Sequence, residues 1–210
     1  MKTNLIVGFV ILLCGAATRA QAQGTIAYYN PEPDLFYLAS GSTPLDVDVN
    51  GDGLKDLRFH FNGRTMVVPL QQATVLSVPA TFPIAVALQN GDTVGSNPGT
   101  NGWSGSYPIV SGELWGPSLA GPVNNGNGQF YRRDGYFGFQ LVEGGQSYYG
   151  WMHVDFASGP IASPFIKEWA YNTVAGQPIT VGQVPEPASI SLLGLGCLLL
   201  WRVGRRRVAG

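Results

Sequence analysis

The chain has 210 residues, of which 45% are hydrophobic and 12% are charged, and its formal net charge is −1. This apolar share is typical of a globular protein and excludes a disordered, strongly charged chain. The 29 glycines and 15 prolines disfavour a helical bundle, because both residues interrupt helices. Residues 23–184 contain twelve acidic and six basic side chains, so we expect no nucleic-acid partner.

The first segment, residues 1–22, has the three parts of a secretory signal peptide. Lys2 provides the positive charge, residues 5–13 form an apolar run, and Ala20-Gln21-Ala22 is a small-x-small cleavage sequence. We therefore expect a signal helix that signal peptidase removes during export. The two cysteines lie in the apolar segments at the ends, so the remaining domain needs no disulfide.

Residues 23–183 are expected to form an all-β domain, an antiparallel β-sandwich or jelly roll. Short alternating runs bounded by Gly, Pro, Asn or Asp are typical of strands and turns. The expected strands are residues 57–61, 64–70, 74–78, 83–88, 135–142, 147–156, 165–171 and 178–181. Asn62-Gly63 predicts a two-residue turn, and residues 143–146 a four-residue turn. Residues 91–128 form either a functional loop or short strands that the pattern does not reveal.

Residues 48–56 carry oxygen-bearing side chains at positions 1, 3, 5 and 9 of the segment, with glycine at position 6. Calcium takes about six to eight oxygen ligands, and alternate residues of a tight loop can all point inward. The candidate ligands are the side chains of Asp48, Asn50, Asp52 and Asp56 and the carbonyl of Leu54. The spacing therefore predicts a calcium loop.

This pattern resembles the calcium loops of β-propeller and dockerin-type proteins, which implies a structural calcium ion as cofactor. It departs from an EF-hand because Phe59 replaces the bidentate Glu at position 12, and because a strand is expected to follow. The alternative is an Asp/Asn/Gly turn with solvated side chains. Four Asp side chains between residues 46 and 56 repel one another without a cation, which favours the calcium interpretation.

The late hairpin places aromatic side chains on both of its faces. In the expected register Val142 faces Ser147, and one almost wholly apolar face points into the core. Sugar rings stack on aromatic surfaces while polar neighbours bind their hydroxyls. The alternative is that a second layer, or residues 91–128, covers the second face. That face carries a candidate glycan platform of Tyr136, Gln140, Tyr149, Trp151 and His153.

Catalytic signatures are weak throughout the chain, and we do not expect an enzyme. There is no nucleophile elbow, no Walker loop and no zinc-binding histidine spacing. Asp134 and Asp155 would face each other across the late hairpin, as the carboxylates of a polysaccharide hydrolase do. The simpler interpretation is a strand-end turn and a surface acid beside two arginines.

The last segment, residues 184–210, combines three features in a fixed order. Pro185-Glu186-Pro187 comes first, an expected transmembrane helix over residues 188–203 follows, and Arg205, Arg206 and Arg207 come after it. Basic residues that follow an apolar helix stay cytoplasmic. The combination resembles the PEP-CTERM sorting signal of Gram-negative bacteria. The resemblance implies that an exosortase in the inner membrane cleaves the tail near Pro-Glu-Pro and passes the protein outward.

These features together predict an exported protein of the cell envelope or extracellular matrix, with a structural calcium loop and no catalysis. We expect it to be anchored in the inner membrane before tail cleavage, and at the cell surface or outside the cell afterwards. One alternative is a carbohydrate-binding module that recognises an exopolysaccharide. A polysaccharide hydrolase is a weaker alternative, because it lacks a motif.

Overall fold

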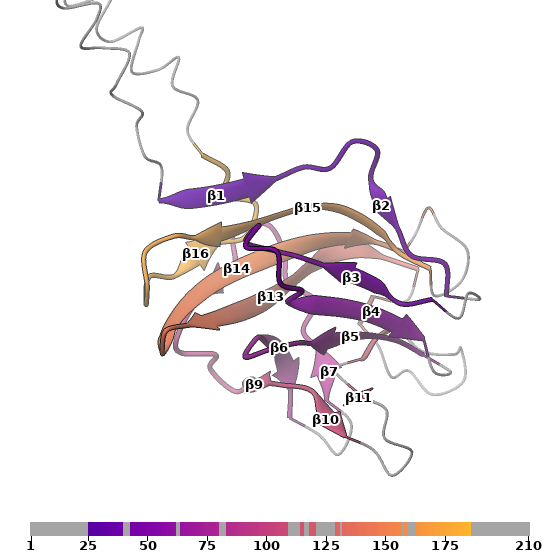
Figure 1. The fold of residues 1–210 in the computed structure, drawn as a ribbon, viewed down its shortest axis with the longest axis horizontal. Coiled ribbons are helices and arrows are strands. Elements are labelled where there is room, and N and C mark those ends of the chain that lie inside the picture. Colours follow the sequence, from indigo (N-terminus) through magenta and orange to yellow (C-terminus); the bar gives the residue numbers. More distant parts are fainter. Residues whose placement is uncertain are drawn as a thin grey trace, which may run out of the picture. The chain divides into compact units, whose positions relative to one another are not determined.

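All regular secondary structure among the described residues of the computed structural model is strand (Figure 1). The structure describes residues 25–185 except 40–42, 62–63, 80–82, 109–113, 116–117, 121–128, 131, 157 and 159–162. Residues 25–184 form one compact unit. The expected signal and transmembrane helices lie outside the described residues, and within those residues no helix is long and apolar enough to cross a membrane.

The described residues form sixteen strands. The first eight are β1 (Ile26–Tyr29), β2 (Leu35–Phe36), β3 (Leu45–Val47), β4 (Leu57–Phe61), β5 (Thr65–Pro69), β6 (Thr74–Val78), β7 (Ile84–Ala85) and β8 (Thr93–Val94). The others are β9 (Gly102–Ser104), β10 (Tyr107–Pro108), β11 (Leu114–Trp115), β12 (Ser118–Ala120), β13 (Asp134–Glu143), β14 (Gln146–Asp155), β15 (Phe165–Asn172) and β16 (Ile179–Thr180).

Twelve of these strands belong to one sheet, in the order β1-β15-β14-β13-β6-β7-β12-β5-β4-β3, with β2 paired to β15 and β9 to β6. Its neighbouring strands are antiparallel except β7 and β12, which run parallel. Two further pairs, β10–β11 and β8–β16, are also antiparallel. The expected all-β, antiparallel class is therefore confirmed.

The two ends of the long sheet share one core. Phe59 of β4 and Phe137 of β13 are fully buried and pack edge to face, with ring centroids 6.4 Å apart. Trp169 of β15 donates a hydrogen bond from its indole nitrogen to the carbonyl of Val49, just after β3, at 3.0 Å. Strands from opposite ends of the strand order therefore face each other across the buried cluster, which is compatible with the expected sandwich.

The long hairpin β13–β14 has the register expected from its sequence. Val142 pairs with Ser147, and the pairing continues at Glu143 and Gln146. The turn therefore has two residues, 144–145, rather than four. Both are glycines with positive φ, +57° and +78°, the conformation that tight hairpin turns require. The face expected to be core is buried at Phe137, Phe139 and Leu141.

Two further local expectations differ from the structure, and of the two alternatives left open for residues 91–128 the one with short strands is found. The pairing of Phe61 with Thr65 leaves three residues between β4 and β5 instead of two. The strand expected over residues 83–88 is only Ile84–Ala85. Residues 91–128 contain five strands of two or three residues each, β8 to β12. Strands this short do not show the alternation from which a sequence pattern is recognised.

Candidate functional site

The loop expected to bind calcium joins β3 to β4, and its own side chains hold its backbone. Asp48 accepts hydrogen bonds from the backbone N–H groups of Gly51 (2.7 Å) and Gly53 (2.9 Å). Both glycines have positive φ, +80° and +90°, which other residues rarely adopt. Asp52 accepts the N–H of Leu54 at 2.7 Å. The Asp/Asn/Gly sequence therefore folds into a tight loop stabilised by side-chain turns.

Asp56 closes this loop from its buried side. Its side chain is buried, and its Oδ2 accepts the N–H of Val49 at 2.8 Å. Burial raises the pKa of the Asp56 carboxyl, and the charges of Asp52 and Asp48 raise it further, against the hydrogen bond from Val49. The loop thus gathers negative charge around a buried carboxyl, an environment that a cation stabilises.

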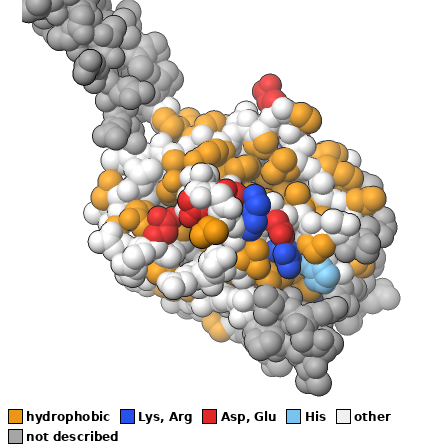
Figure 2. All heavy atoms as spheres, viewed as in Figure 1, with side chains coloured by type: hydrophobic (Ala, Val, Ile, Leu, Met, Phe, Trp, Pro, Cys, Tyr) orange, Lys and Arg blue, Asp and Glu red, His pale blue; other side chains and the backbone are white. Residues whose placement is uncertain are grey.

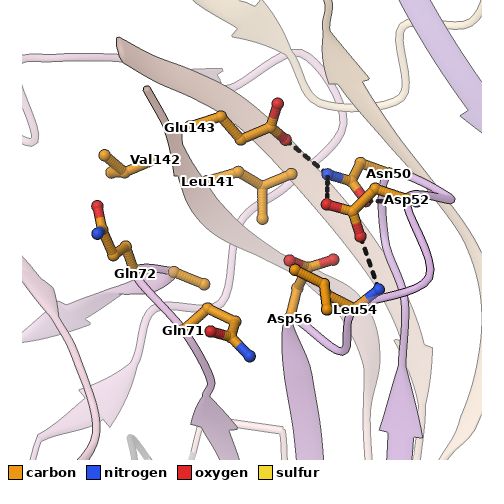
Figure 3. Close-up of a pocket in the computed structure, with 10 residues that line it drawn as sticks. Asn50, Asp52, Leu54, Asp56, Gln71, Gln72, Leu141, Val142 and Glu143 are labelled. Carbon is orange, nitrogen blue, oxygen red and sulfur yellow. Dashed lines mark hydrogen bonds between the residues drawn. The ribbon is translucent and has the colours of Figure 1, made fainter. Parts of the chain in front are cut away.

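A carboxylate from the tip of the β13–β14 hairpin also reaches this loop (Figure 3). Asn50 donates from Nδ2 to Glu143 Oε1 at 2.5 Å and to Asp52 Oδ2 at 3.2 Å. On the other side, the Tyr29 hydroxyl donates to the carbonyl of Asn50 at 3.1 Å. The adjoining hollow, of about 190 Å³, is lined in part by Asp52, Asp56 and Glu143. Sequence reasoning missed Glu143, because 93 residues separate it from Asn50.

The donor chemistry of the loop suits calcium, but its carboxylates do not converge in this structure. Carboxylate, amide and carbonyl oxygens are the ligands that calcium prefers. Among the described residues, no three His, Cys, Asp or Glu side chains are grouped so that they could hold a metal ion. Asp48, Asp52 and Asp56 instead bind backbone N–H groups of the loop. Calcium binding is therefore a proposal that rests on residue types and spacing.

The hairpin face expected to form a glycan platform is largely covered. Trp151 is 0% exposed and Tyr149 is 4% exposed, within a second core to which β8, β9 and β16 contribute. Tyr136 and His153 are partly buried and stack on each other, with ring centroids 4.3 Å apart. Gln140 is hydrogen-bonded to side chains of β6 and β14. Of the two alternatives for this face, the covered one is therefore found at its central aromatic residues. The covering strands are β8 and β9, which lie within residues 91–128, and β16, which lies within the strand expected over residues 178–181.

A group of ionisable side chains joins four neighbouring strands, β13, β14, β15 and β1. The Nε2 of His153 is 2.6 Å from Asp134 Oδ1, and its Nδ1 is 3.4 Å from Glu168 Oε1. Glu168 also accepts a hydrogen bond from the hydroxyl of Tyr28. Burial, with that hydrogen bond, raises the pKa of Tyr28 to about 12. His153 is therefore held between two carboxylates.

Asp134 and Asp155, the pair weighed for a hydrolase, are cross-strand partners as the register predicts. Asp134 binds His153, as described above. Asp155 is buried, accepts the N–H of Ser158 at 3.1 Å, and lies 4.0 Å from the ammonium group of Lys167. Each carboxylate thus has structural partners of its own.

Charged side chains on the face shown in Figure 2 lie mostly in one band among hydrophobic and uncharged atoms. Several opposite charges among the described residues form ion pairs. Arg58 binds Asp46 through two hydrogen bonds of 2.7 and 2.8 Å, and Lys167 binds Asp34 at 2.7 Å. The first pair joins cross-strand partners of β3 and β4, and its two hydrogen bonds fix the orientation of both side chains.

Comparison with protein families identifies a PEP-CTERM protein-sorting motif at residues 183–207. The motif defines a class, that of exported proteins which are anchored in a membrane and then processed by an exosortase. It covers the tail alone and gives no activity to the domain. The structure describes residues 183–185 of this motif, whereas Glu186, Pro187 and residues 205–207 lie outside the described part of the chain. Comparisons with curated proteins and with solved structures give no significant match.

Proposed function

We propose that this chain is an exported protein of a Gram-negative cell envelope or extracellular matrix, freed from the inner membrane when an exosortase cleaves its tail. The sorting motif at residues 183–207 is the observation that carries this proposal. Residues 1–22 support it, because they have the composition that signal peptidase substrates share. A helix over residues 188–203 would be the temporary anchor, with residues 205–207 on its cytoplasmic side.

The proposed role of the domain is structural rather than catalytic. Several of its acids are engaged in ion pairs, such as Asp34 with Lys167 and Asp46 with Arg58. Its stability rests on a large apolar core without cysteine, since both cysteines of the chain lie in the end segments. A domain of this size can be stable outside the cell without disulfides.

We include a structural calcium ion in residues 48–56 in this proposal. Asp48, Asn50, Asp52 and Asp56 have the types and spacing of calcium ligands. Burial raises the pKa of Asp56, and the nearby charges of Asp52 and Asp48 raise it further, so a cation beside these carboxylates would be stabilising. Glu143 adds a carboxylate beside the loop, of the kind that an EF-hand carries at its twelfth position. The ion would stabilise the contact between this loop and the hairpin tip.

The two alternatives are less well supported. Carbohydrate binding through the hairpin face requires exposed aromatic rings, whereas Trp151 and Tyr149 are buried. A hydrolase would use Asp134 and Asp155, and both already bind other side chains or backbone groups. A structural role is therefore the function that we propose.

Pulse labelling of the full chain, co-expressed with an exosortase in a Gram-negative host, tests the proposed sorting. The wild-type chain should pass from a full-length membrane form to a shorter form without the tail. Glu186→Ala, or deletion of residues 205–207, should leave the full-length form in the inner membrane. Glu143→Gln, a change in the domain, is the control and should be processed normally. Persistence of full-length wild-type protein would contradict the proposal.

A further inference from the structure

A second hollow, of about 160 Å³, is lined by β6, β9 and parts of residues 88–101, and it shares no lining residue with the hollow beside the calcium loop. The chain around it is held by its own hydrogen bonds. Asn97 Oδ1 accepts the N–H of Gly99 at 3.1 Å, and the N–H of Asn101 donates to the carbonyl of Pro98 at 3.2 Å. The hollow is therefore formed without a ligand, as binding pockets usually are.

One side of this hollow is apolar and aromatic. Leu76 and Leu88 line it and are buried, and Trp103 lines it as a partly buried side chain. The indole of Trp103 packs on buried Tyr149, with ring centroids 5.7 Å apart and an angle of 33° between the rings. Its Nε1 is buried and has no hydrogen-bond partner among the described residues. The ring of Trp103 is thus held in place by the core, and its indole N–H donates no hydrogen bond to any described residue.

The rest of the lining is polar and offers both donors and acceptors. Asp92 and Thr93 contribute an exposed carboxylate and an exposed hydroxyl, and Asn97 and Asn101 contribute amides. Asp92 Oδ2 accepts the N–H of Gln89 at 2.8 Å, which fixes that carboxylate beside the hollow. These groups can bind hydroxyl groups of a ligand, since hydroxyls both donate and accept.

The charge of the lining and the volume of the hollow limit which class of ligand can bind. Among the described residues of the lining there is a carboxylate and no Lys or Arg, which disfavours phosphates and uronic acids. An apolar side with leucine and tryptophan disfavours a bare cation. A volume of about 160 Å³ is below the roughly 300–1,000 Å³ of pockets for larger ligands, so only a small unit fits.

We propose that this hollow binds one neutral sugar unit, with Trp103 against the carbon face of the ring and Asp92, Asn97 and Asn101 on its hydroxyls. A pyranose has one apolar face and a rim of hydroxyls, which matches a lining of one aromatic side and several polar side chains. This site is separate from the covered hairpin face and does not depend on the proposed sorting or on calcium.

Saturation-transfer NMR and calorimetry on the full chain test this proposal, in a detergent without a sugar headgroup. The probes are the methyl glycosides of glucose, galactose, mannose and N-acetylglucosamine, with glucuronic acid as a charged comparison. At least one neutral glycoside should bind saturably with a dissociation constant of about 1 mM or somewhat weaker, as expected for a small ligand. Glucuronic acid should bind more weakly.

Variants then locate the binding site. We expect two substitutions, Trp103→Ala and Asn101→Ala, each to raise the dissociation constant of the glycoside at least about tenfold. Losses of this size are expected when a buried contact, or the partner of a sugar hydroxyl, is removed. Phe36→Ala removes an aromatic residue that is 40% exposed and does not line the hollow, so it should bind like wild type. If the Trp103→Ala variant does not fold, the Asn101→Ala variant still tests the site. No saturable binding up to about 50 mM, unchanged affinity in Asn101→Ala, or preference for glucuronic acid would overturn the proposal.

Discussion

Among the described residues, Trp151 is the largest fully buried side chain, and its burial shows that this face of the hairpin belongs to a core. Its ring packs edge to face on Tyr136, with centroids 5.5 Å apart. Trp151→Ala should lower the free energy of unfolding by about 3–5 kcal/mol, because it leaves a cavity in the second core. Phe36→Ala, at a side chain that is 40% exposed, should cost about 1 kcal/mol or less in the same urea titration. Equal, small losses in both variants would show that the face is open.

Tyr28 gives the domain a predictable response to alkali. Its pKa is raised to about 12 by burial and by the hydrogen bond to Glu168, against about 10 in the unfolded chain. A raised folded-state pKa means that its contribution to stability is complete below pH 10 and is lost as the pH rises toward 12. In the Tyr28→Phe variant, the free energy of unfolding should therefore decrease less between about pH 10 and 12 than it does in the wild type. Tyr148→Phe is the control, and an identical fall in both variants would contradict the assignment.

At Gly150, in β14, the packing between β13 and β15 leaves no room for a side chain. A Cβ there would lie 2.2 Å from the ring of Phe139 and 2.7 Å from the carbonyl oxygen of Ala170. Gly150→Ala should therefore destabilise the fold by at least about 1–3 kcal/mol, because buried backbone must shift. Gly105→Ala is a matched control, since nothing lies within 4 Å of its Cβ position. Thermal unfolding of the two variants measures the difference, and equal melting temperatures would refute the packing described.

The β3–β4 loop carries the calcium prediction. Loops of this kind outside the cell bind calcium at about 0.1–1 mM, and at 100 times Kd the ion adds roughly 2.7 kcal/mol of stability. The melting temperature should rise in excess calcium relative to EGTA, and Asp52→Asn should abolish the rise. Glu143→Gln should reduce it if the hairpin tip supplies a ligand. Asp34→Asn, a change at an acid outside the loop, should keep it. Equal melting temperatures in calcium and EGTA would reject the site.

At the level of elements, local patterns predicted local structure. The β13–β14 register followed from ten-residue strands of alternating apolar residues, which fix both faces at once. The tight turns in residues 48–56 followed from Asp, Asn and Gly chemistry. The contact of Glu143 with Asn50 was beyond sequence reasoning, because it depends on how the long sheet folds over. The packing of β8, β9 and β16 over Trp151 could not be derived from sequence. β8 and β9 have only two and three residues, and the pattern that predicts β16 does not show where that strand packs.

For the whole molecule, the sequence predicted more about destination than about activity. The tail motif is a contiguous pattern that can be recognised without a fold, and it is found where expected, at residues 183–207. The all-β class also followed from composition and turn residues. The strand order of the twelve-stranded sheet could not be predicted, because pairings such as β1 with β15 join residues about 140 positions apart.

The most direct test of the account is the intact mass of the protein that accumulates in cells producing its own exosortase. The account predicts a mature chain that begins at residue 23 or 24 and ends near Pro185-Glu186-Pro187, without Arg205, Arg206 and Arg207. Such a mass places both cleavages outside the folded unit of residues 25–184. A stable envelope protein whose mass still includes the sequence through Gly210 would contradict the central claim.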